Sequence, residues 1–124
     1  MNLEEVLEKI PAIREELRNK SRWQDINWLL EQMLALTTYN SYLSEYIATL
    51  HRNASEKAYT QFKQAVKSGA TVTGAEQESK GKSLDEREAY ENVLNIRKST
   101  TDLIIGLRLF IRTKSDEKRE QENG

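Results

Sequence analysis

Apolar residues recur along most of the chain with the spacing of one face of an α-helix. Near the N-terminus the steps between them alternate between three and four residues, through Leu3, Val6, Ile10, Ile13 and Leu17. We expect a helical segment over residues 3–20, which Pro11 should kink or divide because proline lacks a backbone N–H. The chain shows no alternation typical of strands, so the pattern predicts an all-α fold.

A longer pattern predicts a second helix over residues 22–67, with Ser21 and Gln24 at capping-box spacing at its start. Beside its aliphatic stripe lies a line of aromatic residues: Trp28, Tyr39, Tyr42 and Tyr46. One antiparallel partner helix would cover less than this combined apolar width. We therefore predict that the aromatic line forms an oligomer or partner interface, although tyrosines at helical spacing are also typical of ordinary packing.

A glycine-dotted polar stretch, residues 69–83, separates this helix from the next. Gly69 is suited to end a helix, and Gly81 should break a second one. Two residue pairs have capping-box spacing, namely Thr73 with Glu76 and Ser83 with Glu86. We expect a structured crossover with a short helix over residues 74–79, followed by a new helix.

The last helix is expected over residues 84–114, because Val93, Ile96, Leu103, Leu107 and Phe110 follow helical spacing. Residues 115–124 form a polar tail that we expect to be disordered. The prediction is a single helical domain over residues 1–114. Its architecture is a long antiparallel helical hairpin with a short crossover helix and an N-terminal helical segment, assembled into oligomers.

Composition excludes several kinds of chemistry. The chain has no cysteine and one histidine, His51, so a thiolate site and an ordinary zinc site are excluded. No nucleophile or oxyanion hole is indicated beside His51, and we expect a non-enzymatic protein without a cofactor or metal. The absence of cysteine, of a long apolar run and of a signal-peptide pattern leads us to expect a cytoplasmic protein that does not contact membranes.

Charge alternates along the chain despite a formal net charge of −1. Basic residues dominate residues 51–82 and 97–119. The candidates for contact with nucleic-acid phosphates are Lys57, Lys63, Lys67, Lys80, Lys82, Arg97, Arg108 and Arg112. Tyr59, Phe62 or Tyr90 could then stack on bases. Since the whole domain is not basic, composition alone favours solubilising charges or partners to nearby carboxylates.

The region from about residue 50 to 114 combines three features: a basic residue before alanine in a long helix (Lys57, Ala58), the glycine-broken crossover, and a patterned last helix. The pattern of that helix comprises Tyr90, Leu94, Arg97, Leu103, Leu107, Arg108, Ile111 and Arg112. In these features the region resembles the UvsY-like recombination mediators of phages. Here Tyr59 stands where the family's step has a second basic residue.

The resemblance implies a non-enzymatic homo-oligomer that binds single-stranded DNA and helps to load a recombinase onto strands covered by single-strand-binding protein. Its partners would be itself, single-stranded DNA, and a recombinase or single-strand-binding protein. The alternative hypothesis is a protein–protein adaptor, inhibitor or assembly chaperone that acts through an exposed aromatic helix face. Neutralisation of Lys57, Lys63 and Lys67 should separate the two, because only the first hypothesis requires salt-sensitive binding to nucleic acid.

Overall fold

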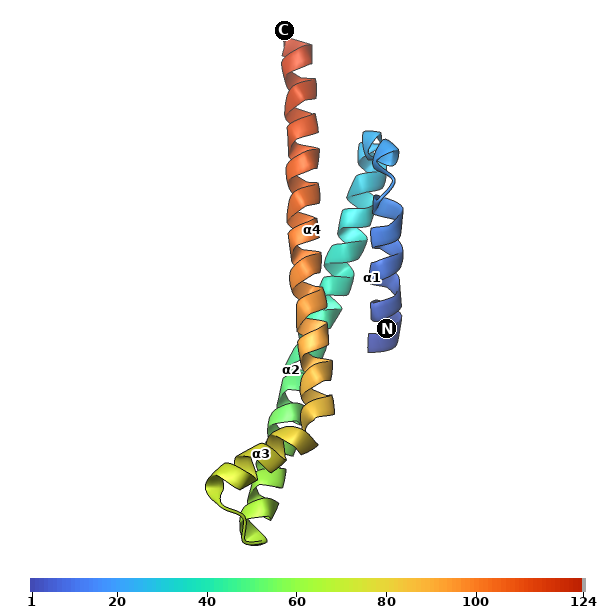
Figure 1. Cartoon of the computed structure of the whole chain (residues 1–124). Coiled ribbons are helices and arrows are strands. Elements are labelled where there is room, and N and C mark those ends of the chain that lie inside the picture. The colour runs from blue at the N-terminus through green and yellow to red at the C-terminus, as the bar shows by residue number, and fades with distance from the viewer. Residues whose placement is uncertain (124) are drawn as a thin grey trace. The chain divides into compact units, whose positions relative to one another are not determined.

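The computed structural model describes residues 1–123, and its regular elements there are helices (Figure 1). In chain order they are α1 (Leu3–Leu17), a 3₁₀-helix η1 (Lys20–Gln24), α2 (Ile26–Lys67), α3 (Val72–Lys82) and α4 (Leu84–Asn123). The described residues contain no strand, so the predicted all-α fold class is confirmed. Within this range, no helix has the length and apolar character needed to cross a membrane.

The chain forms two compact units, and both α2 and α4 contribute to each of them. The first unit combines Met1–Leu43 with the described residues from Arg97 onward. The second unit consists of Ser44–Ile96. The first unit thus contains α1, η1, the beginning of α2 and most of α4, whereas the second contains α3 and the remaining parts of α2 and α4.

The first unit is held together by apolar side chains from three helices. Its most deeply buried residues are Val6, Ile10 and Leu17 of α1, Leu29, Leu36 and Leu43 of α2, and Thr100, Ile104 and Leu107 of α4. Within each helix they recur at helical spacing, so one stripe of each faces the core. In Figure 1, α1 (blue) lies beside the first part of α2 (cyan).

Polar and aromatic contacts show that α2 and α4 run antiparallel in the first unit. Asn40 Nδ2 donates to Thr101 Oγ1 at 2.9 Å. Further back along the chain, Trp23 meets Phe110 edge to face, with ring centroids 5.1 Å apart. A residue earlier in the chain therefore contacts a residue later in α4, so the two helices run in opposite directions, as predicted for a helical hairpin.

The second unit turns the chain at Gly69. This glycine has a φ of +93°. Beside it, Ala70 N–H donates to Ala65 O at 3.0 Å, and Gly69 N–H donates to Val66 O at 3.1 Å. These two bonds form a Schellman motif, which satisfies carbonyls at the end of α2 and requires a left-handed residue. The prediction that Gly69 ends the long helix is confirmed. Buried Ala65, Ala75 and Val93 then pack the unit.

The crossover differs from its predicted details. The N-cap of α3 is Thr71, whose Oγ1 accepts from Gly74 N–H at 3.1 Å, so the predicted start at Thr73 is wrong. The helix also continues through Gly81 to Lys82. Ser83 Oγ donates back to Ser79 O at 2.7 Å instead of capping α4. The small side chains of Ser79 and Ser83 are both buried.

Two other predicted boundaries are corrected in the first unit. Pro11 does not divide α1, which runs unbroken from Leu3 to Leu17. Pro11 is exposed, so the carbonyl that loses its N–H partner can be hydrated. The long helix begins at Ile26 and not near Arg22, because Asp25 Oδ1 accepts from Trp28 N–H at 3.1 Å and caps α2.

The C-terminal segment also differs from the expectation of a disordered tail over residues 115–124. Helix α4 continues through Asn123, and residue 124 lies outside the described residues. Lys114 Nζ lies 3.4 Å from Glu117 Oε2. Extension of an existing helix needs no new nucleus, and this segment is rich in Glu, Lys, Arg and Gln, which favour helix.

Candidate functional site

The strongest candidate among the predicted basic residues is one face of α2 in the second unit. Tyr59, Lys63 and Lys67 follow each other at four-residue steps, and together with Thr60 and Gln64 they line a shallow groove of about 220 Å³. Tyr59 is 63% exposed, unusually open for an aromatic side chain. Lys63 Nζ lies 5.2 Å from the Tyr59 ring centroid. We refer to these five residues as the Tyr59 face.

The Tyr59 face combines the two chemistries that single-stranded nucleic acids require. The exposed phenol ring offers a flat surface for base stacking, and the two ammonium groups follow it at steps of about 6 Å along the helix axis. Neither lysine takes part in an ion pair among the described residues. Both charges therefore remain available for phosphate oxygens.

The other predicted lysines of this unit lie in different surroundings. Lys57 is exposed on α2, about 80° or more around the helix from Lys63 and Lys67 at ~100° per residue. Lys82 pairs with Glu78 at 2.9 Å. Lys80 lines a separate pocket of about 260 Å³ that also contains Arg87 and Glu91. The predicted cluster is therefore divided, and the Tyr59 face holds two of its five lysines.

His51 lies at the same pocket as Lys80. Its ring meets the ring of Tyr90 edge to face, with centroids 5.0 Å apart and an interplanar angle of 61°. This contact gives His51 a packing partner and occupies one of the aromatic rings that we considered for base stacking. Across residues 1–123, His, Cys, Asp and Glu form no group of three or more that could hold a metal ion.

The three predicted arginines belong to the first unit. Arg97, Arg108 and Arg112 are all exposed along α4. Arg112 follows two exposed apolar residues, Ile105 and Leu109. Among the described residues of this unit, no aromatic ring is as exposed as Tyr59, so these arginines, predicted to contact phosphates, have no comparable stacking surface beside them.

The predicted aromatic interface is less open than the sequence suggested. Trp28 is only 9% exposed, and the Arg22 guanidinium covers its ring at 4.0 Å. Tyr39, Tyr42 and Tyr46 are each half-buried. Their faces are partly used for packing, so the exposed aromatic surface of the adaptor hypothesis is reduced. A role for these residues in oligomer or partner contacts stays a prediction.

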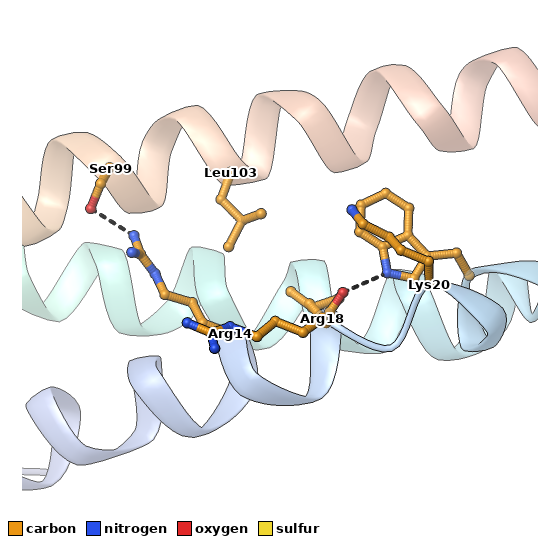
Figure 2. Close-up of a pocket in the computed structure, with 7 residues that line it drawn as sticks. Arg14, Arg18, Lys20, Ser99 and Leu103 are labelled. Carbon is orange, nitrogen blue, oxygen red and sulfur yellow. Dashed lines mark hydrogen bonds between the residues drawn. The ribbon is translucent and has the colours of Figure 1, made fainter.

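Sequence reasoning missed a basic pocket in the first unit (Figure 2). It has a volume of about 330 Å³, and its lining residues are Arg14, Leu17, Arg18, Lys20, Trp23, Ser99 and Leu103. Trp23 Nε1 donates to Leu17 O at 2.9 Å, and Lys20 Nζ lies 3.6 Å from the Trp23 ring centroid. The four-residue step from Arg14 to Arg18, followed by a tryptophan, was the signal that could have indicated it.

Arg14 is the most constrained cation of this pocket. Its Nη2 donates to Ser99 Oγ at 2.6 Å and lies 3.3 Å from Thr100 Oγ1. Its Nε is buried and has no hydrogen-bond partner among the described residues. Arg18, at the rim of the pocket, is 79% exposed and pairs with Glu15 at 3.4 Å. The pocket therefore combines an apolar wall with three cations.

Comparisons with protein-family models, curated proteins and solved structures found no match for this chain.

Proposed function

We propose that the protein binds single-stranded nucleic acid without catalysing a reaction, and that the Tyr59 face of α2 is its contact surface. The observation that carries this proposal is the Tyr59 ring, 63% exposed, on the same helix face as two lysines that form no ion pair within residues 1–123. A base would stack on Tyr59, while Lys63 and Lys67 would contact successive phosphates. Such binding tolerates any base, because each has an aromatic face.

The wider role in recombination follows from the resemblance to UvsY-like mediators. In this proposal, a homo-oligomer of the chain holds single-stranded DNA and assists a recombinase on strands covered by single-strand-binding protein. Repeated weak sites in one assembly raise the overall affinity, which suits a chain with a near-zero net charge. Strand exchange by a recombinase, with and without this protein on covered strands, is the assay for that role.

The contact surface is tested by the salt dependence of binding to a fluorescein-labelled oligo(dT) strand. Each single-strand phosphate contact contributes about −0.7 to the slope of log K against log salt. The variant Lys63→Gln/Lys67→Gln should therefore show a slope that is shallower by about 1.4 and a weaker affinity. The matched control Lys9→Gln/Lys118→Gln removes two exposed lysines elsewhere and should keep the wild-type slope.

An unchanged slope in the Lys63/Lys67 variant would show that the Tyr59 face is not the contact surface. Equal losses in both double variants would indicate only a general effect of net charge. A duplex of the same length provides a further comparison, because stacking on Tyr59 requires unpaired bases and should favour the single strand.

A second candidate function, that of a protein adaptor, is favoured by the basic pocket beside Trp23. Three cations and an apolar wall suit an acidic peptide that carries one large apolar side chain. Its carboxylates would meet Arg18 and Lys20, and its apolar side chain would lie against Leu103 and Trp23. This version of the adaptor hypothesis uses the pocket in Figure 2 instead of the tyrosine line.

A further inference from the structure

One exposed stripe of α4 has an ordered sequence of charged and apolar residues. Its members are Lys98, Asp102, Ile105, Leu109, Arg112 and Asp116, at successive steps of four, three, four, three and four residues. At ~100° per residue they lie within about 80° of one another around the helix. The alternating steps are those of a heptad seam, which one helix presents to another. We refer to these six residues as the α4 stripe.

The α4 stripe lies on the side of the helix opposite to the core. Thr100 and Leu107 of α4 are fully buried, and Ile104 is nearly so. By contrast, Ile105 is 48% exposed and Leu109 is 56% exposed. The four charged members are also exposed. The first unit therefore leaves this seam uncovered, with two large apolar residues at its centre.

The charges of the α4 stripe match those of a second, antiparallel copy of the same stripe. If the two helices cross at residue 107 of each copy, Lys98 of one copy would oppose Asp116 of the other, and Asp102 would oppose Arg112. Ile105 would oppose Leu109 in the same register. All three layers are then favourable at once: two pair opposite charges and the central one pairs two apolar side chains.

We propose that two copies of the chain form a two-fold symmetric dimer in which their α4 stripes pack antiparallel. Two-fold symmetry repeats each pair, so the interface would contain four ion pairs around a central apolar layer of four side chains. Gly106 lies beside the seam, and no atom lies within 4 Å of a Cβ built there.

The in-register parallel arrangement of the same seam is disfavoured by its charges. In register, it would place each of the four charged residues against its own copy, giving four like-charge contacts. Ion pairs within one helix would compete with ion pairs between the two copies. Lys98 and Asp102 are four residues apart, as are Arg112 and Asp116. The structure records neither ion pair among the described residues, and a basic residue preceding its acidic partner is the less favourable order in a helix.

The dimer does not rest on the proposed nucleic-acid binding, because the Tyr59 face contributes no residue to it. Residues 98–116 cover about 27 Å of helix at ~1.5 Å per residue, a short contact compared with those of permanent dimers. We therefore expect reversible association that depends on concentration and weakens with salt.

Charge reversal tests the register, with sedimentation velocity over a range of concentrations as the measurement. Arg112→Asp alone would place a carboxylate opposite Asp102 of the other copy in both symmetric pairs. It should therefore weaken the dimer by about tenfold or more. Asp102→Arg alone should do the same. The combined variant Asp102→Arg/Arg112→Asp restores both opposite-charge pairs and should recover the wild-type dissociation constant. Lys118→Asp, also exposed on α4 but away from the stripe, is the matched control and should change little.

Cross-linking tests the direction of the two helices without background, because the chain has no cysteine. Ile105→Cys and Leu109→Cys are prepared as separate proteins, mixed and oxidised. The antiparallel register predicts a disulfide between the two different variants, whereas a parallel pair would link each variant to itself. Both positions are exposed, so the fold should tolerate either change.

A wild-type chain that stays monomeric at several hundred micromolar would overturn the proposal. Failure of the combined charge variant to recover association, or a predominance of disulfides within each variant type, would do so as well. Association that persists unchanged in Arg112→Asp would place the contact between copies on another surface.

Discussion

Arg14 Nη2 of α1 donates a hydrogen bond to Ser99 Oγ of α4 at 2.6 Å, joining residues 85 positions apart in the chain. The same nitrogen lies 3.3 Å from Thr100 Oγ1, and Thr100 is fully buried in the core of the first unit. One guanidinium therefore attaches the end of α1 to α4. These hydrogen bonds explain why the Arg14 side chain is partly buried between helices.

Removal of this guanidinium should destabilise the first unit. We expect Arg14→Met to lower the free energy of unfolding by about 1–3 kcal/mol, because the two hydroxyls lose a charged donor while the aliphatic stem is kept. Urea denaturation followed by circular dichroism measures the change. Arg18→Met is the matched control: its side chain is 79% exposed, and its loss should change the free energy by less than about 0.5 kcal/mol. Equal effects of the two variants would contradict a structural role for Arg14.

Loss of the Tyr59 ring should weaken single-strand binding without changing its salt dependence. Tyr59→Ala removes a stacking surface worth about 1–3 kcal/mol per base, whereas Tyr59→Phe keeps it. Titration of labelled oligo(dT) at several salt concentrations should give parallel lines for wild type and Tyr59→Ala, displaced in affinity. The ring is exposed, so thermal stability should be nearly unchanged in both variants. Wild-type affinity in Tyr59→Ala would exclude stacking at this position.

Two glycines should respond to alanine in opposite directions. Gly69 has a φ of +93°, where a Cβ is strained, so Gly69→Ala should lower the free energy of unfolding by about 1 kcal/mol. Gly81 lies inside α3 with no atom within 4 Å of an added Cβ. Gly81→Ala should therefore raise the free energy of unfolding by about 0.4–1 kcal/mol. Thermal and urea denaturation check both values, and the same sign for both would contradict the observed turn.

Two leucines of α4, two residues apart, should separate folding from association. Leu107 is fully buried, and Leu107→Ala should lower the free energy of unfolding by about 2–5 kcal/mol. Leu109 is 56% exposed, and Leu109→Ala should change the free energy of unfolding by less than about 0.5 kcal/mol at low protein concentration. In sedimentation, however, Leu109→Ala should weaken the proposed dimer. Low concentration matters because association itself stabilises the folded chain.

An acidic peptide should bind the pocket beside Trp23 if the protein also acts as an adaptor. The probe is a fluorescein-labelled peptide with several aspartates and one phenylalanine. Arg18→Gln/Lys20→Gln should weaken its binding about tenfold, because two cations at the pocket are lost. The double variant Lys63→Gln/Lys67→Gln carries the same charge change in the other unit and should bind the peptide normally. Equal losses in both variants would indicate non-specific attraction.

Local patterns were sufficient to predict the helices and several of their ends. The three-and-four spacing from Leu3 to Leu17 and the run without glycine or proline after Ala12 predicted α1 and α2, because helical periodicity depends only on neighbouring residues. Gly69 was predictable as a helix end for the same reason. The prediction was wrong at Ser83, whose hydroxyl donates a hydrogen bond to Ser79 O and does not cap α4.

Residue order along the chain thus determined that this protein is helical, where its polar crossover lies, and which residues carry exposed charge. Only the tertiary structure decided that Tyr59 is open while Trp28 is buried, and that Arg14 reaches Ser99 in another helix. The physical reason is the range of each interaction. Helix formation depends on contacts a few residues apart, whereas exposure and pocket formation depend on which faces of distant helices pack together.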